Sequence, residues 1–345
     1  MKQESAAGLS ATPTFVGIDA GTTNTRVWLV AGDRILARGE APVGARDTAR
    51  DGHDRALRAG VRDLISEVRA QAPSGGPAPA CVAAAGMITS AQGLHEVPHV
   101  TAPAGVAELA AGARDAVLPN VADLPFLFIP GVRTAPDPAP PGVGARDVMR
   151  GEETLAIGLV GQGRLAPASA LLNVGSHWKL IRIDEAGRVA GSVTSLAGET
   201  MQAVRKETIL ASALPPGPLA APDVRLLLEG MDEARASGLA RALFCVRLLD
   251  LTGTTTPEGR LSFLIGAFIG ADLAGLQGRG HLAPAAAVTI AGDDKTGGAW
   301  RMALEHAGHR VQALTPAEIE AGFLAGLAAI VAARGIQGRT GTSVL

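Results

Sequence analysis

The chain has 345 residues, which exceeds the size of one ordinary compact domain and predicts two. Hydrophobic residues make up 47% of it and aromatic residues only 3%, so Ala, Val, Leu and Ile are expected to fill two cores. A net charge of −2 gives no field that would attract nucleic acid or an anionic membrane, which excludes those classes of partner.

The chain shows no targeting or metal-binding pattern. Every long apolar run is interrupted by charge before it reaches the length of a membrane helix. The first residues, MKQESAAGLSATPT, lack the apolar region of a secretory signal. Cys81 and Cys245 lie in apolar runs without metal-ligand spacing, so we interpret them as buried, unpaired thiols. We therefore expect a cytoplasmic protein.

The first half alternates between strands and helices. Apolar strands are predicted at 15–19 and 25–30, joined by a turn of small residues. The elements that follow are a helix at 56–71, a strand at 81–86, a helix at 105–117, a strand at 124–132 and a helix at 151–163. Segment 133–147 is rich in Pro and Gly and predicts a loop near the functional site.

The second half opens in the same way as the first. Strands at 169–175 and 176–184 form a second hairpin, continued by 187–196. The later predicted elements are helices between 199 and about 280, a strand at 286–294, a helix at 297–308, a strand at 309–314 and a helix at 316–333. Two α/β domains, 14–165 and 166–335, are therefore expected, with a cleft between them and flexible tails at 1–13 and 336–345.

The turn of the first hairpin predicts a phosphate site. Gly21 allows close approach of an anion, and the hydroxyls of Thr22 and Thr23 and the backbone N–H groups can bind phosphate oxygens. Asp19, at the end of the strand, is placed to hold hydrated Mg²⁺. The sequence is not a Walker A loop, because a strand follows and the Gly-Lys-Ser/Thr ending is missing. A plain hairpin turn remains the alternative.

The second hairpin repeats this layout with Gly175 and Ser176, followed by Lys179. Lys179 can neutralise phosphate charge, and a solvated strand lysine is the alternative. A third turn, at Gly292 and Asp293, ends a strand and can accommodate a nucleoside against the backbone. In chain order these are two phosphate turns and then a nucleoside turn, which predicts ATP as the ligand.

These motifs resemble a known family. The stretches IDAGTTNTR (18–26), AAGMITS (84–90), DVMRGEETLAIG (147–158) and GSHWK (175–179) are similar to the 2-dehydro-3-deoxygalactonokinases. That family belongs to the sugar kinase, heat-shock ATPase and actin superfamily. The resemblance implies two actin-like, ribonuclease H-like domains and transfer of phosphate from Mg·ATP to the 6-hydroxyl of 2-dehydro-3-deoxy-D-galactonate. Ala20 departs from the tryptophan usual in the family.

The resemblance also suggests where the acceptor hydroxyl is activated. Related kinases place an acid at the start of the helix before the second phosphate hairpin, so Glu153 is the predicted base and Glu152 the alternative. Both acids also suit the first turn of a helix for electrostatic reasons alone.

The remaining predicted contacts concern the sugar acid and the metal. Arg150 offers a bidentate fork for the substrate carboxylate, while Arg26 contacts substrate or forms an ion pair with Asp19. The other predicted contacts are Asn24, Thr89, Ser90 and His177 for substrate, with Glu199 orienting Mg²⁺ or a water.

Competing functions stay open at this point. One is another sugar or sugar-acid kinase of the same fold; another is a nucleotide-switched binding protein without a small acceptor. The expected partners are a small sugar acid and ATP, and a homodimer is left open. The sequence does not distinguish a galactonate from a gluconate derivative.

Overall fold

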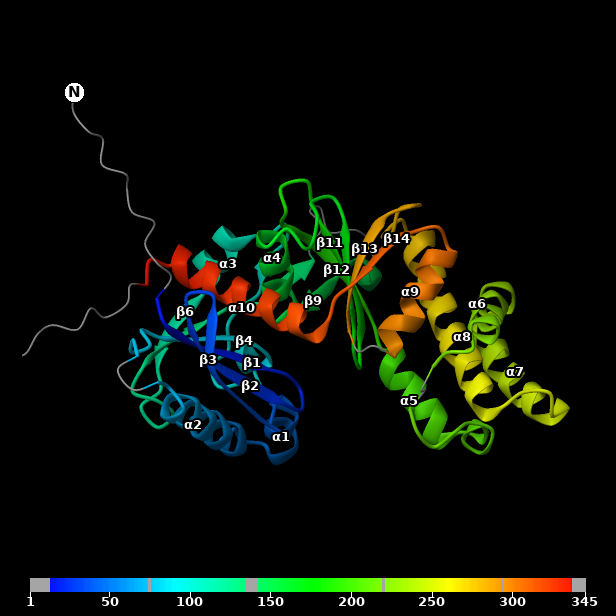
Figure 1. The fold of residues 1–345 in the computed structure, drawn as a ribbon, viewed down its shortest axis with the longest axis horizontal. Coiled ribbons are helices and arrows are strands. Elements are labelled where there is room, and N and C mark those ends of the chain that lie inside the picture. The colour runs from blue at the N-terminus through cyan, green and yellow to red at the C-terminus, as the bar shows by residue number, and fades with distance from the viewer. Residues whose placement is uncertain (1–12, 74–75, 135–141, 219–220, 293–294, 337–345) are drawn as a thin grey trace, which may run out of the picture. The chain divides into compact units, whose positions relative to one another are not determined.

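A computed structural model describes residues 13–73, 76–134, 142–218, 221–292 and 295–336 (Figure 1). The described residues form two compact units. Unit 1 falls within residues 1–133, 148–162 and 322–345, and unit 2 within residues 134–147 and 163–321.

Unit 1 is built on a six-stranded mixed sheet. Its strands are β1 (Phe15–Ala20), β2 (Thr25–Ala31), β3 (Arg34–Ala41), β4 (Val82–Gly86), β6 (Arg114–Val117) and β7 (Pro125–Phe128). They are ordered β3-β2-β1-β4-β7-β6. The first three form an antiparallel meander, β4 and β7 run parallel to β1, and β6 pairs antiparallel with β7.

Unit 2 repeats this topology with five strands. They are β10 (Ala170–Val174), β11 (Trp178–Ile183), β12 (Val189–Ser195), β13 (Ala287–Gly292) and β14 (Arg310–Ala313), ordered β12-β11-β10-β13-β14. Again the first three strands form an antiparallel meander, and the next two run parallel to its first strand. The predicted pair of hairpins, each opening an α/β unit, is confirmed.

Helices cover both sheets, and short elements complete the chain. The helices are α1 (Ala45–Asp51), α2 (Arg55–Ala70), α3 (Val106–Gly112), α4 (Glu152–Gly161), α5 (Ala197–Glu207), α6 (Val224–Ser237), α7 (Leu239–Thr252), α8 (Pro257–Gly278), α9 (Thr296–His306) and α10 (Pro316–Ala333). Three short strands, β5 (Val100–Thr101), β8 (Val132–Thr134) and β9 (Asp147–Met149), form a separate small sheet. Single turns of 3₁₀-helix lie at Met87–Thr89, Val143–Ala145 and Ile209–Ser212.

The pattern of apolar residues explains how α2 packs. Its buried residues, Leu57, Val61, Leu64, Ile65 and Val68, follow the three- and four-residue spacing of one helix face. This face lies on β2 and β3 in unit 1 (Figure 1). The remaining residues are mostly polar and exposed, as expected for a helix on the surface of a sheet.

Glycines let two pairs of helices cross with their backbones in contact. A Cβ on Gly158 of α4 would lie 1.9 Å from the carbonyl oxygen of Gly322 in α10. In unit 2, a Cβ on Gly266 of α8 would lie 1.8 Å from the carbonyl oxygen of Leu227 in α6. Both distances are too short for any side chain, so glycine is required at each crossing.

Two helices, α8 and α10, are long and apolar enough to span a membrane by length and composition alone. Packing accounts for that character. Residues 259–270 of α8 are all buried in unit 2, and α10 places Leu324 and Leu327 against β1 at Gly17.

Some predicted elements differ from the structure. The helix expected at 105–117 ends at Gly112, and the remainder forms β6, because pairing with β7 outweighs helical propensity. The strand expected at 124–132 is divided into β7 and β8 around Pro130, which cannot donate to a sheet. The compact units also differ from a division at residue 165, since the end of α10 packs on β1 and so joins unit 1.

Candidate active site

The first turn joins β1 to β2 in unit 1. Asp19 lies directly opposite Arg26 in the strand pair, and the N–H of Gly21 donates to the carbonyl of Asn24 at 2.8 Å. Arg26 Nη2 contacts Asp19 Oδ2 at 2.5 Å, so the predicted alternative of an ion pair at this position is present. Thr22 is exposed and Thr23 half-buried, which leaves both hydroxyls accessible to a ligand.

The start of α1 fixes the orientation of this turn. The N–H groups of Ala45 and Arg46 donate to the carbonyls of Gly21 and Thr22 at 3.2 and 2.9 Å. In a trans peptide the N–H points opposite to the carbonyl, so the N–H groups of Thr22 and Thr23 point away from α1. In the described part of the chain, neither N–H has a backbone partner. Two adjacent donors of this kind form an anion-binding surface.

The second turn, in unit 2, is anchored in the same way. Asn173 lies opposite Lys179 in the strand pair, and the N–H of Glu199 at the start of α5 donates to the carbonyl of Ser176 at 2.9 Å. The N–H of His177 belongs to the same peptide unit and therefore points away from α5. His177 Nε2 lies 3.2 Å from Glu199 Oε1, which brings these two predicted residues together.

Each turn also rests on a glycine at the start of the anchoring helix, Gly44 just before α1 and Gly198 in the first turn of α5. A Cβ on Gly44 would lie 2.5 Å from the carbonyl oxygen of Thr22, and a Cβ on Gly198 would lie 2.4 Å from that of Ser176. Sequence reasoning missed the role of both glycines. The available signal was a glycine just after the third strand of each meander, but a glycine there is common in any loop.

A second pair of glycines lies on the strand parallel to each hairpin. Gly86 at the end of β4 lies opposite Ala20, and Gly292 at the end of β13 lies opposite Val174. Added Cβ atoms would lie 2.5 and 2.8 Å from the carbonyl oxygens of those partners. The predicted nucleoside turn therefore begins at a position where only glycine fits, and Asp293 lies outside the described residues.

The start of α4 lies beside Asp19 in unit 1. Gly151 adopts a φ of +104°, and its added Cβ would lie 3.3 Å from Gly86 Cα and 3.9 Å from Asp19 Oδ1. Only glycine adopts such a backbone readily, so the sequence before the two glutamates is constrained by local geometry.

The two glutamates of α4 have different surroundings. Glu153 is 0% exposed, and both of its carboxylate oxygens accept the N–H of Gly151, at 2.8 and 2.9 Å. Glu152 is only half-buried, and its Oε2 accepts the N–H of Arg150 at 3.2 Å. Its charge acts on the Asp19 carboxyl, which places Glu152 beside the first turn.

Asp19 has an unusual electrostatic environment. Burial raises the pKa of its carboxyl above the ordinary value, the charge and hydrogen bond of Arg26 lower it, and Glu152 raises it further. The net pKa is raised, so the ionised form needs an additional positive charge to be stabilised. The described residues contain no group of three or more His, Cys, Asp or Glu side chains that could hold a metal, so a cation here would be completed by water and phosphate oxygens.

Arg150, Thr89 and Ser90 are engaged within unit 1. Arg150 donates from Nη1 to Thr89 Oγ1 and from Nη2 to the carbonyl of Val97, both at 2.8 Å. Thr89 donates to the carbonyl of Gly86 at 3.0 Å, and Ser90 to that of Met87 at 2.7 Å. These predicted substrate contacts therefore also fix the segment after β4.

Lys179 is 6% exposed, so the alternative of a solvated strand lysine is wrong. In unit 1 the structure gathers Asp19, Arg26, Glu152 and Gly86 with the first turn. In unit 2 it gathers Gly175, Ser176, His177 and Glu199, with Gly292 one strand away.

Comparisons with known proteins agree with this arrangement. The model of the 2-keto-3-deoxy-galactonokinase family matches residues 19–330. The 2-dehydro-3-deoxygalactonokinase of Escherichia coli is 27% identical over 328 residues, covering 92% of this chain and 98% of the relative. A crystal structure of a candidate 2-dehydro-3-deoxygalactonokinase from Sinorhizobium meliloti has a TM-score of 0.73 and 25% identity, covering 92% of this chain and 97% of that one. The expected fold class, two actin-like ATPase domains, is confirmed.

Proposed function

The chain belongs to the 2-keto-3-deoxy-galactonokinase family, whose members are ATP-dependent sugar-acid kinases, and on this premise we propose that it phosphorylates the 6-hydroxyl of 2-dehydro-3-deoxy-D-galactonate. The observation that supports this best is a family match over residues 19–330 that includes both anchored turns. Phosphoryl transfer depends mainly on positioning and charge neutralisation, which such turns can supply.

The phosphates of one ATP are bound by both turns. The N–H groups of Thr22 and Thr23 and the threonine hydroxyls hold phosphate oxygens from one side. Gly175, Ser176 and the N–H of His177 hold them from the other, and Lys179 contributes positive charge. Gly292 and Asp293 contact the nucleoside.

Asp19 holds hydrated Mg²⁺ in this proposal. The fit comes from a carboxylate with a raised pKa beside a second acid, an arrangement that a divalent cation stabilises. When bound, the ion neutralises charge on the phosphates. Arg26 keeps the Asp19 carboxylate oriented through its ion pair. Glu199, which is itself held by its contact with His177, orients a water.

We propose Glu152, the alternative of the two predicted acids, as the base that accepts the proton of the attacking hydroxyl. Glu152 is accessible and lies beside Asp19. Glu153 is buried and accepts the Gly151 N–H on both oxygens, so we assign it a positioning role at the start of α4. A base must reach the proton it removes, which favours the exposed carboxylate.

The sugar acid is bound near the segment that Arg150 fixes. Arg150 holds Thr89 in place, and with Ser90 these side chains form one wall of the site. Asn24 is exposed on the first turn and can bind a sugar hydroxyl. His177, on the second turn, is a further contact. A cytoplasmic location, where ATP is available, and a homodimer are part of this proposal.

The assay that tests this function couples ADP release to a panel of acceptors. ADP release with 2-dehydro-3-deoxy-D-galactonate, together with a product phosphorylated at the 6-position by phosphorus NMR, is the expected result. A stronger response to the gluconate epimer or to a neutral hexose would reassign the substrate. Slow ATP hydrolysis that no acceptor accelerates would favour the nucleotide-switched alternative.

A further inference from the structure

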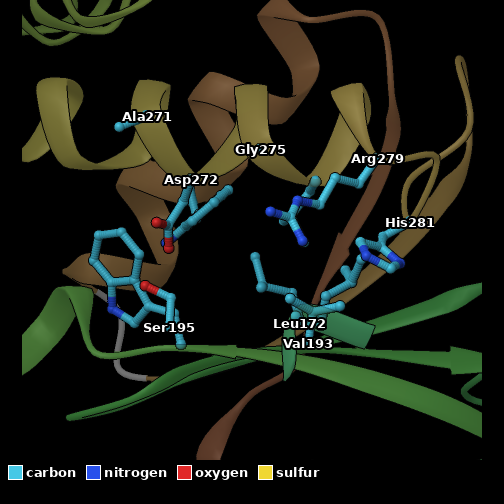
Figure 2. Close-up of a pocket in the computed structure, with 13 residues that line it drawn as sticks. Leu172, Val193, Ser195, Ala271, Asp272, Gly275, Arg279 and His281 are labelled. Atoms are coloured by element: carbon cyan, nitrogen blue, oxygen red, sulfur yellow. The ribbon is translucent and has the colours of Figure 1, made fainter. Parts of the chain in front are cut away.

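Unit 2 contains a half-open cavity of about 190 Å³, and its lining includes none of the residues assigned to the second turn (Figure 2). It lies between the sheet and the helices α8 and α9. The sheet contributes Leu172, Leu180 and Val193, and the indole rings of Trp178 and Trp300 form a further part of the wall. The middle of the cavity is therefore apolar and aromatic.

Opposite charges lie along one side of this cavity. Asp272 lies in α8 and Arg279 is the residue that directly follows this helix, seven residues later, which is about two helical turns or ~10.5 Å along the axis. Figure 2 shows both side chains projecting from the helix toward the strands that bear Leu172 and Val193. In the part of the chain that the structure describes, neither side chain forms an ion pair with the other or with a third residue.

The acidic end lacks a counter-charge. Burial raises the pKa of the Asp272 carboxyl, and a hydrogen bond from Ser195 lowers it only in part. Among the described residues, no cation acts on the pKa of this carboxyl. A cationic group entering the cavity would stabilise the ionised carboxylate.

The other end is basic. His281 lines the cavity beside Arg279, and burial together with the charges of Arg182 and Arg279 lowers the pKa of the imidazole. An anionic group is therefore favoured at this end.

The aromatic wall has unused donors. Trp178 and Trp300 are 2% and 0% exposed, and among the described residues the Nε1 atoms of both lack a hydrogen-bond partner. Buried indole N–H groups usually have an acceptor. Since neither nitrogen is accessible, the two rings contribute apolar surface to the wall of the cavity.

We propose that this cavity is a second small-molecule site, which binds a linear ω-amino carboxylate with its ammonium group at Asp272 and its carboxylate at Arg279 and His281. A chain of about four to six carbons would span the two ends, given the seven residues that separate Asp272 from Arg279. Such a zwitterion compensates both ends at once, whereas a ligand with only a carboxylate leaves the partly buried Asp272 carboxyl uncompensated. The site is independent of the proposed kinase reaction.

Calorimetric titration of the full chain with three matched probes tests the proposal. The probes are 6-aminohexanoate, hexanoate, which lacks the ammonium, and hexylammonium, which lacks the carboxylate. The zwitterion is expected to bind about tenfold more tightly than either half-charged probe, because each removes one charge-assisted hydrogen-bonded contact. A change in tryptophan emission on binding is expected as well, since two of the three tryptophans line the cavity.

Two variants assign the ends of the ligand. Asp272→Asn should remove the advantage of 6-aminohexanoate over hexanoate, and Arg279→Met its advantage over hexylammonium. Arg310→Met, which removes an exposed arginine on β14, is the matched control and should bind as the unmodified chain does. Melting curves establish that each variant is folded. The comparison of the three probes uses the unmodified chain and does not depend on the variants.

Equal affinities for all three probes would overturn the proposal. So would the absence of binding at millimolar concentration, or an unchanged preference in both variants.

Discussion

The two hairpin turns share one framework and differ in charge. Each turn lies between an antiparallel pair of strands, is held by N–H groups at the start of a helix, and rests on a glycine that no other residue can replace without movement. Where the first hairpin has Asp19 opposite Arg26, the second has Asn173 opposite Lys179. The exposed arginine is ion-paired, and the lysine is buried.

This difference indicates that the two turns have different chemical roles. The repeated framework provides backbone donors for phosphate twice, because its geometry depends on glycines and peptide groups rather than on side-chain charge. Among the residues assigned to the two turns, the neighbouring acids Asp19 and Glu152 lie at the first turn. Metal binding and proton transfer are thus expected from unit 1, and charge neutralisation from unit 2.

Replacing Asp19 by Asn gives the first turn the residue of the second and should have the largest effect. The neutral amide cannot balance a divalent cation, so kcat is expected to fall by about 100- to 1,000-fold. Activity measured against Mg²⁺ concentration checks this, with saturation shifted to higher Mg²⁺. Asn173→Ala is the matched control in the second hairpin, and a loss equal to that of Asp19→Asn would contradict the asymmetry.

Glu152→Gln and Glu153→Gln separate a base from a positioning group. Loss of a general base costs about 10²- to 10⁴-fold in kcat, which is expected for Glu152→Gln with ATP binding retained. Glu153→Gln should lower the melting temperature, because both oxygens of Glu153 accept the Gly151 N–H. Its effect on kcat should be smaller than that of Glu152→Gln. If the two kcat values are affected in the reverse order, Glu153 is the base.

Adding a methyl group beneath either turn tests the shared framework. Gly44→Ala and Gly198→Ala place a Cβ 2.5 and 2.4 Å from a turn carbonyl, so each should lower stability by about 1–3 kcal/mol and raise the KM for ATP. Gly161→Ala and Gly298→Ala add the same methyl group on helices with nothing within 4 Å, and serve as controls. Denaturant titration and ATP kinetics distinguish the pairs, and unchanged kinetics in either turn variant would argue against a role for that turn.

The smallest expected effect is on the pH dependence of stability, and it concerns two acids with raised pKa values. Asp19 has Arg26 beside it, whereas within the described segments no cation acts on Asp272. A raised pKa means that folded Asp272 holds its proton more tightly than the unfolded chain does. Its burial therefore costs little stability below the ordinary pKa of about 3.9 and progressively more as pH rises to the folded pKa.

Asp272→Asn removes this pH-dependent cost. Relative to the unmodified chain, the melting temperature of the variant should rise as pH increases from about 4 to about 7. A difference that stays constant over this range would show that Asp272 ionises as freely in the folded state as in the unfolded one. Asp63→Asn, on an exposed part of α2, provides the control.

The sequence predicted those features that depend on local pattern. The hairpins, the helix at 316–333 and the order of the two turns follow from apolar periodicity and glycine positions. The strand at 114–117 could not be predicted, because it depends on pairing with β7. The difference between Glu152 and Glu153 also required the structure, since both fit the first turn of a helix equally and only the backbone at Gly151 separates them.

A crystal structure with Mg²⁺ and a non-hydrolysable ATP analogue tests the central claim most directly. We expect the N–H groups of Thr22, Thr23 and His177 to lie within about 3.2 Å of phosphate oxygens of the same nucleotide. A nucleotide that contacts only one of the two turns, or neither, would contradict it.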